Sequence, residues 1–444
     1  MRVPALLTKS LAPLLLVLLA CSFVGVHATQ NEELSPFDEW VYVDYLYKVP
    51  TEGVVRQGEE TGEEAREAIS CLGVAITLPA QPALCAQVEA GTETGDQFPQ
   101  QGLQSADIYT PAYFVATYAL AQPFLWAGVD SLLDAGTYVG AVWLALGAVL
   151  LYASLRRVRV PRLTSFALSA VTTVAPPLFW ATTYVSTDAP SLAVGAGLLY
   201  LGLRLATGGR WPVAALFVLL SVVGVLLKLQ NIVAVGLVAL FLLARAVTLA
   251  AGEREQDRTA RGVVLRVVRD RGTVAAVSAV VLSVVGQGAW IVVRGLLSVG
   301  PSPDQGTAAP FGVRELVDEA FRFLPATAQD NTGTLGTALS LAGTLLSLLV
   351  IAGVLGLLFS APRASLEQAL AGASLVAVLV AGPLLAVGVV AVTGYYFPLP
   401  ARYGLVLIPA LVTCSGILAS RWRGTGPVLA VVLLPVAVGA AIVA

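Results

Sequence analysis

The sequence predicts an all-α polytopic membrane protein, and three observations lead to this fold class. First, 57% of the 444 residues are hydrophobic and only 12% are charged, whereas soluble domains carry about 25% charged residues. Second, the apolar residues gather in windows of roughly twenty, the length of a helix that crosses a bilayer. Third, the charged residues collect in the loops between these windows.

The apolar windows can be taken in order along the chain, and each is a candidate transmembrane helix. They are 11–27, 111–128, 136–154, 165–184, 188–205, 213–227, 231–248, 274–293, 338–359, 370–393, 403–420 and 426–443. No glycine-rich phosphate loop follows a strand, so soluble-nucleotide chemistry has no support. No exposed basic patch is interleaved with aromatic residues, so we expect no nucleic-acid partner.

The distribution of arginines predicts the orientation. Loop 245–273 carries seven arginines, whereas loop 28–110 carries fifteen carboxylates and three cations. Cytoplasmic loops are rich in Lys and Arg, so we expect 245–273 inside and 28–110 outside. Counting crossings between these two loops leaves one window too many. We therefore expect 111–128, which contains Pro111 and Pro123, not to cross fully, which leaves about eleven spans.

Five regions follow from this scheme. We expect a first transmembrane helix in 1–27 and an acidic outward loop in 28–110. A block of transmembrane helices follows in 111–293. We then expect a second outward loop with an amphipathic surface helix in 294–337, and the C-terminal transmembrane helices in 338–444. The N-terminus also fits a signal peptide with Val26 and Ala28 at the cleavage site, or a loose lipobox ending at Cys21. Both alternatives leave loop 28–110 outside.

Cysteine and histidine usage narrows the chemistry. Cys71 and Cys85 lie fourteen residues apart in the outward loop. In an oxidising compartment this spacing predicts a disulfide that closes part of the loop. His27 is the only histidine, which excludes a multi-histidine metal site.

The stretch 35–50 holds the first candidate site residues. Asp38 and Glu39 stand side by side about ten residues after the first apolar window, and an aromatic run follows at once. A carboxylate beside amphipathic aromatic residues suits chemistry at the bilayer boundary. The alternative is an anchoring helix on the membrane surface.

Four further charged residues fall on the same predicted side, and each has a structural alternative. Asp107 precedes a Pro–aromatic cluster, and Asp188 opens a helix that it could simply cap. Lys228 interrupts an apolar stretch, which marks a functional candidate unless its amine reaches the surface. Arg402, followed by Tyr403, is either an anion clamp or a surface anchor.

In their order and common sidedness, Asp38-Glu39, Thr187-Asp188-Ala189, Lys228 and Arg402-Tyr403 resemble the GT-C membrane glycosyltransferases. The likeness is to bacterial members akin to protein mannosyltransferases and the aminoarabinose transferase of lipid A. It covers most of the chain from about residue 9 to 420, although each motif is short.

The resemblance implies an inverting glycosyltransferase that acts on the outer face of the cytoplasmic membrane. Its donor would be a polyprenyl-phosphate sugar, and its acceptor a glycan, lipid or protein. Asp38 resembles the catalytic carboxylate and Glu39 its partner, while Lys228, Arg402 and Tyr403 resemble donor phosphate-binding positions. Asp188 and Asp107 match positions that bind a divalent metal (Mg, Mn or Zn) in some members. Here the order Asp-Ile-Tyr-Thr-Pro departs from the usual Glu or His before Pro-Pro-aromatic, and metal use stays open.

Two other functions compete with the transferase. A transporter, or a lipid or polysaccharide flippase, would need discontinuous helices and polar residues at mid-membrane. A non-catalytic subunit of envelope assembly would show degenerate motifs. Most charges here lie at helix ends, which favours the transferase over coupled transport.

Overall fold

The computed structural model describes residues 5–75, 83–252, 260–303, 306–324, 326–327 and 335–443. In this part of the chain there are eighteen α-helices and no β-strand, only isolated bridges such as that between Ala309 and Tyr396. The all-α fold class predicted from composition is therefore confirmed.

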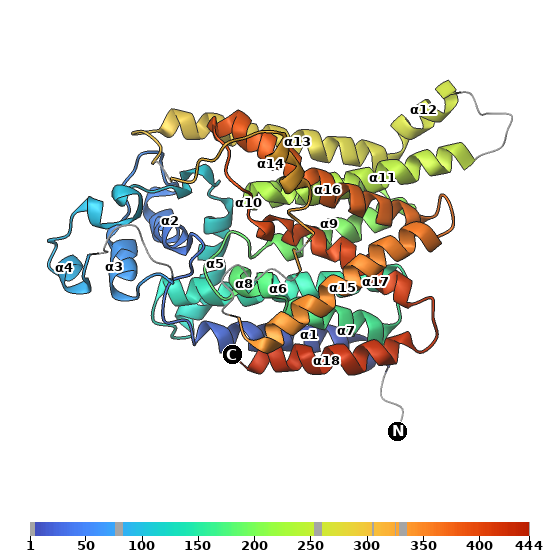
Figure 1. The fold of residues 1–444 in the computed structure, drawn as a ribbon, viewed down its shortest axis with the longest axis horizontal. Coiled ribbons are helices and arrows are strands. Elements are labelled where there is room, and N and C mark those ends of the chain that lie inside the picture. Colours follow the sequence, from blue (N-terminus) through green and yellow to red (C-terminus); the bar gives the residue numbers. More distant parts are fainter. Residues whose placement is uncertain are drawn as a thin grey trace.

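The helices and their bounds, labelled as in Figure 1, follow the chain in order. They are α1 (Ala5–Ala28), α2 (Glu39–Glu52), α3 (Glu63–Cys71), α4 (Cys85–Glu89), α5 (Ala112–Trp126), α6 (Leu132–Arg157), α7 (Arg162–Thr173), α8 (Pro176–Thr182), α9 (Ser191–Ala206), α10 (Trp211–Leu227), α11 (Ile232–Gly252), α12 (Ala260–Arg269), α13 (Arg271–Leu297), α14 (Val313–Ala320), α15 (Thr337–Ser360), α16 (Leu366–Thr393), α17 (Ile408–Ala419) and α18 (Thr425–Ile442). Short 3-10 turns η3 (Ala106–Ile108), η4 (Leu229–Asn231) and η6 (Ala401–Leu407) connect some of them.

The protein is a multi-pass membrane protein by the length and composition of its helices. Among the described residues, eight helices are long and apolar enough to cross a bilayer, or nine if one bent pair counts as a span. The apolar helices α9 and α10 are shorter, with 16 and 17 residues. These helices correspond to all the predicted windows except 111–128.

Helix α5 covers the window that we expected not to cross. It has 15 residues and is not among the candidate spans. At 1.5 Å per residue it is about 22 Å long, shorter than the hydrocarbon core of about 30 Å. Figure 1 places α5 with α2, α3 and α4 at one end of the bundle, and α12 at the opposite end.

The predicted continuous span 165–184 is wrong in one respect, because it breaks into α7 and α8, which meet at 61°. Pro176 and Pro177 start α8. Neither proline has a backbone N–H to continue the helical hydrogen bonds, and the residue before a proline disfavours the helical conformation. The break is surrounded by protein, since residues 167–199 are all buried.

Helix α2 differs from the anchoring surface helix that the aromatic run suggested. Residues from Glu39 to Leu46 are buried, with Tyr42 1% exposed and Tyr45 0% exposed. The Tyr45 ring stacks on Phe114 of α5 at a centroid distance of 3.9 Å. The aromatic residues of α2 therefore hold this helix against α5.

Two glycines allow the close helix contacts that set the centre of the bundle. A Cβ atom at Gly140 of α6 would lie 1.9 Å from the Thr182 carbonyl oxygen, and one at Gly195 of α9 would lie 2.2 Å from that of Val406. Small residues let membrane helices approach in this way. The Gly195 contact seats η6 against α9.

Candidate functional site

Asp38 stands at the start of α2 in a strained conformation. It is the N-cap residue of that helix, with φ 63° and ψ 10°. This left-handed region is uncommon for residues other than glycine, although Asp and Asn occupy it more readily than most. Such conformations persist where the surrounding structure holds them, often at functional sites. The Asp38 side chain is 48% exposed.

Glu39 is turned away from the surface and joins two segments. Its Oε2 accepts a hydrogen bond from the Ser35 N–H at 2.7 Å, and its Oε1 accepts one from the Val185 N–H at 2.7 Å. Burial raises the pKa of this carboxyl to about 7, although the two N–H groups act in the opposite direction. Glu39 thereby fastens the segment before Asp38 to the loop that carries Asp188.

Arg402 lies in η6 and bridges two carboxylates from distant parts of the chain. Its Nη2 lies 3.2 Å from Asp38 Oδ2, and its Nε lies 3.2 Å from Asp188 Oδ2. The planar guanidinium, with donors in a fixed fork, is suited to such a bridge. Arg402 is therefore not a surface anchor.

Asp188 lies in the loop between α8 and α9, where it meets a second cation. Lys228 Nζ, between α10 and η4, lies 2.5 Å from Asp188 Oδ1. The Lys228 side chain is 1% exposed, so its amine does not reach the surface. No side chain caps α9, whose N-cap residue is Pro190. Both structural alternatives, capping by Asp188 and snorkelling by Lys228, are therefore wrong.

These contacts make one cluster, which we call the charged tetrad: Asp38, Asp188, Lys228 and Arg402. It contains two carboxylates and two cations, so its formal charge is zero. A buried charge is tolerated where it is paired, and Asp188 is 4% exposed on its side chain. Asp38 is the most exposed member, with 48% of its side chain accessible.

Aromatic rings surround the two cations. Lys228 Nζ lies 5.2 Å from the centre of the Tyr403 ring, and the Arg402 guanidinium lies 4.8 Å from that of Phe37. Rings at these distances attract cations. Tyr42 and Tyr109 lie nearby with their hydroxyl oxygens 3.1 Å apart, and burial holds the pKa of both well above the usual value. They are hydrogen-bond donors at neutral pH.

A second buried carboxylate supports the segment before Arg402. Glu319 of α14 accepts hydrogen bonds from the Tyr396 hydroxyl at 2.6 Å and the Leu399 N–H at 3.0 Å. The same helix exposes Val313 and Val317, with 78% and 53% of their surface accessible. Helix α14 therefore has the amphipathic character predicted for 312–324, with one face held to the protein by Glu319.

Asp107 does not join the tetrad. Its Oδ2 accepts a 2.6 Å hydrogen bond from Arg294 Nε at the end of α13. Burial raises the pKa of Asp107, and the Arg294 guanidinium opposes that shift. The structure therefore gives Asp107 a cationic partner of its own, separate from Asp188.

The carboxylates as arranged do not fit a divalent cation. Both oxygens of Asp188 face cations, and Asp107 is paired with Arg294. Across the described residues, no group of three or more His, Cys, Asp or Glu residues could hold a metal ion. We therefore derive no step through a metal at Asp188 and Asp107.

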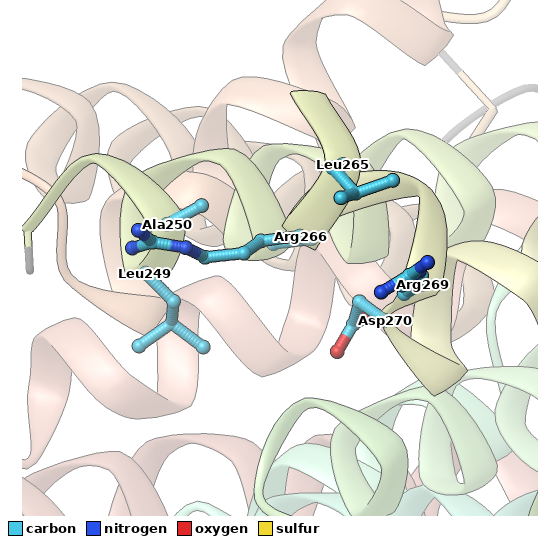
Figure 2. A pocket seen from close by; sticks show the side chains of 7 residues that line it. Leu249, Ala250, Leu265, Arg266, Arg269 and Asp270 are labelled. Atoms are coloured by element: carbon cyan, nitrogen blue, oxygen red, sulfur yellow. The ribbon is translucent and has the colours of Figure 1, made fainter. Parts of the chain in front are cut away.

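The Cys71–Cys85 disulfide expected from the sequence is present, and its Cα atoms lie 4.7 Å apart. It joins α3 to α4 and contributes no atom to the tetrad. A hollow of about 400 Å³ lies between α11, α12 and Asp270, and the tetrad residues do not line it. Figure 2 shows this hollow from close by. Its labelled lining residues are Leu249, Ala250, Leu265, Arg266, Arg269 and Asp270.

Sequence reasoning identified all four tetrad residues and Tyr403, but missed several of their neighbours. Phe37 and Tyr42 lay in the stretch that was singled out, and their position beside Asp38 was the available signal. Tyr109 lies two residues after Asp107. Arg294 comes one residue after a predicted span, where an isolated cation gives no sign of its partner.

Comparison with known proteins adds no family. No protein-family model matches the sequence, and no curated protein matches it significantly. The fold and the site define a multi-pass, all-helical membrane protein with a largely buried tetrad of charges at the end of the bundle where α2 lies.

Proposed function

We propose that this protein is a membrane glycosyltransferase that moves a sugar from a polyprenyl-phosphate-linked donor to an acceptor. The proposal includes an outward-facing site in the cytoplasmic membrane, because the acidic segments and the arginine-rich loops occupy opposite sides in the predicted topology. The observation that carries it is the bridge from Arg402 to both Asp38 and Asp188, with Lys228 on the other oxygen of Asp188.

In the proposed reaction, Asp38 is the general base. A carboxylate within hydrogen-bond reach takes the proton of an acceptor hydroxyl as that oxygen attacks the anomeric carbon. The bond from this carbon to the phosphate oxygen breaks, and its electron pair leaves with the polyprenyl phosphate. Attack opposite the leaving group inverts the anomeric configuration. Asp38 suits this role because its side chain is half-exposed while Arg402 fixes one of its oxygens.

Arg402 and Lys228 are proposed to stabilise the leaving phosphate. Preorganised cations in a water-poor site stabilise developing negative charge more than they would in water. Both cations are already held by Asp188, so they need little reorganisation when a phosphate arrives. Tyr403, whose ring lies beside both of them, would restrict the directions in which they can move.

The test is turnover by the purified full chain in lipid, with a panel of polyprenyl-phosphate sugars as donors. Asp38→Asn should lower the release of polyprenyl phosphate by at least roughly a hundredfold, the usual contribution of a general base. Asp318→Asn is the matched control, because Asp318 on α14 is 59% exposed and pairs only loosely with Arg314. Equal turnover by Asp38→Asn and wild type would remove the proposed role of Asp38.

A second candidate function, lipid translocation, is favoured by one observation. The α7–α8 pair is a helix broken at 61° inside the protein, and transporters often build their sites from discontinuous helices. Vesicles with a fluorescent polyprenyl phosphate in one leaflet distinguish the two functions. Movement between leaflets without release of sugar or lipid phosphate would favour translocation over transfer.

The orientation has its own test. A single cysteine introduced at Arg261, in a variant whose Cys21 and Cys414 are replaced by Ser, should be protected from an impermeant thiol reagent in intact cells. Labelling from outside would place loop 245–273 and the tetrad on the sides opposite to those proposed.

A further inference from the structure

A second hollow lies among the arginines where α6 and α9 end. It is an open hollow of about 460 Å³ between α1, α6 and α9. Its lining includes Pro13 of α1, Val149, Tyr152, Arg156 and Arg157 of α6, and Tyr200 of α9. The hollow thus combines two guanidinium groups and two phenols with an apolar wall.

The surrounding sequence is basic and has no acid to offset it. Asp188 is the only Asp or Glu between positions 135 and 252, and it belongs to the charged tetrad. In the same span, six arginines lie at the ends of α6 and α9, in the turns after them or at the start of α7. These are Arg156, Arg157, Arg159, Arg162, Arg204 and Arg210.

The arginines of the hollow are held in place by local contacts. Arg157 Nη2 donates to Thr207 Oγ1 at 2.6 Å, which ties the end of α6 to the end of α9. Arg156 donates to the Val160 carbonyl oxygen. A guanidinium has five N–H donors, so each contact leaves others for a ligand. The Arg204 guanidinium lies 6.0 Å from the centre of the Tyr200 ring.

The walls of the hollow continue into an apolar surface. On α1, Leu14 and Leu18 follow Pro13 toward the middle of the helix and are 55% and 52% exposed. On α6, Leu146 and Val142 precede Val149 and are 45% and 38% exposed. A ligand in this hollow would therefore place its polar part against the arginines and an acyl chain along α1 and α6.

We propose that this hollow binds the headgroup of an anionic phospholipid in the leaflet on the arginine-rich side. Basic pockets between membrane helices on the positive side suit such headgroups, and guanidinium groups match phosphate oxygens in a bidentate manner. This site is independent of the proposed transferase reaction, because it uses none of the tetrad residues.

The hollow in Figure 2 differs from the hollow between α1, α6 and α9 in the charge of its lining. It also carries arginines, but Asp270 is part of its lining and adds a negative charge. Acidic residues also occur in the adjoining sequence, at Glu253, Glu255 and Asp257. Arg269 of the Figure 2 hollow therefore provides a control at the same end of the bundle for the loss of one arginine.

The experiment uses the full chain in nanodiscs of phosphatidylcholine that contain a small fraction of a photoactivatable phosphatidylglycerol. Crosslinks should map to peptides containing Pro13, Val149–Arg157 or Tyr200. Each arginine removed should lower labelling of these peptides roughly fivefold, in line with the attraction of one basic residue to an anionic lipid surface. Arg156→Gln/Arg157→Gln should therefore lose most of the labelling, and Arg269→Gln should retain it.

Arg157→Gln alone keeps the test interpretable if the double variant does not fold, because Arg157 is exposed and its side chain donates a hydrogen bond to Thr207 at the surface. Equal labelling in Arg157→Gln and wild type would overturn the proposal, as would equal labelling by a photoactivatable phosphatidylcholine. Inorganic phosphate distinguishes the source of the ligand. If it suppresses labelling at millimolar concentration, the hollow binds free phosphate and the lipid assignment is wrong.

Discussion

The two ends of the helical bundle hold their charges in opposite ways. At the end with α2, Lys228 and Arg402 each meet the Asp188 carboxylate, and Lys228 is almost fully buried. At the other end, Arg156 and Arg157 lie at the surface in a stretch of sequence without acids. A cation removed from water needs a carboxylate nearby, whereas a cation at the membrane surface can face anionic lipid instead. The burial of a cation therefore determines whether it needs a carboxylate as its partner.

Removing Asp188 should have the largest effect, because it would leave two cations without their common partner. Asp188→Asn should lower the free energy of unfolding by about 3–5 kcal/mol, the usual cost of breaking a buried ion pair. Asp188→Asn/Lys228→Met should cost less than the single change, since no lysine is then left unpaired. Denaturant unfolding in one detergent measures both, with Asp134→Asn as the exposed control. Additive costs in the double variant would mean that the two residues are not coupled.

The stability of the end of the bundle with α2 should also depend on pH, through the carboxyl group of Glu39. Its carboxyl has a folded pKa of about 7 against an unfolded value near 4.5, because burial disfavours the charged form. The folded state holds this proton over a wider range, so its stabilising contribution is complete below pH 4.5 and is lost as pH rises through 7. A shift of this size corresponds to up to about 3 kcal/mol.

Glu39→Gln isolates this contribution from the other titrating groups, since Gln has a similar shape and no proton to lose. Melting temperature measured from pH 5 to pH 8 should fall more steeply in wild type than in the variant. Parallel curves for the two proteins would show that Glu39 does not titrate in this range.

The same contrast explains how much could be predicted from the sequence. The bundle was predictable because membrane helices must satisfy their backbone internally, so apolar windows of fixed length mark them directly. The break between α7 and α8 was not recognised although Pro176-Pro177 is visible, because buried surroundings can support or prevent such a break. Asp38, Asp188, Lys228 and Arg402 were identifiable because charges in a sparsely charged chain are conspicuous.

The sequence could not predict which carboxylate pairs with which cation. Asp188 was open to a capping role and Lys228 to snorkelling, since both conformations are available to an isolated helix end. Only the packing of α9 against η6, which Gly195 allows, brings Arg402 to Asp188. Asp107 shows the opposite outcome, because Arg294, 187 residues away, is its partner. Such pairings depend on the tertiary fold.

Arg402→Lys should have an intermediate effect, because it keeps the charge and loses the forked geometry. A single ammonium is poorly placed to reach both Asp38 and Asp188, so one charge-assisted hydrogen bond is lost, at a cost of about 1.5–3 kcal/mol. Arg314→Lys is the matched control, since Arg314 is 88% exposed. The comparison is made by chemical unfolding. If the two variants lose the same stability, the bridge contributes nothing beyond its charge.

The smallest predicted effect comes from salt, and it should distinguish the two ends most clearly. Raising sodium chloride from about 0.01 M to 1 M shortens the Debye length from about 30 Å to 3 Å. Repulsion among the six surface arginines is then screened, which should stabilise the wild type by roughly 0.2–0.5 kcal/mol for each close like-charged pair. The buried Asp188–Lys228 pair should respond little, because water and ions do not separate its members.

Arg157→Gln/Arg159→Gln should therefore flatten the salt dependence of the melting temperature, while Asp188→Asn/Lys228→Met should leave its slope unchanged. The reverse pattern would mean that salt reaches the tetrad and that the arginine end is already neutralised.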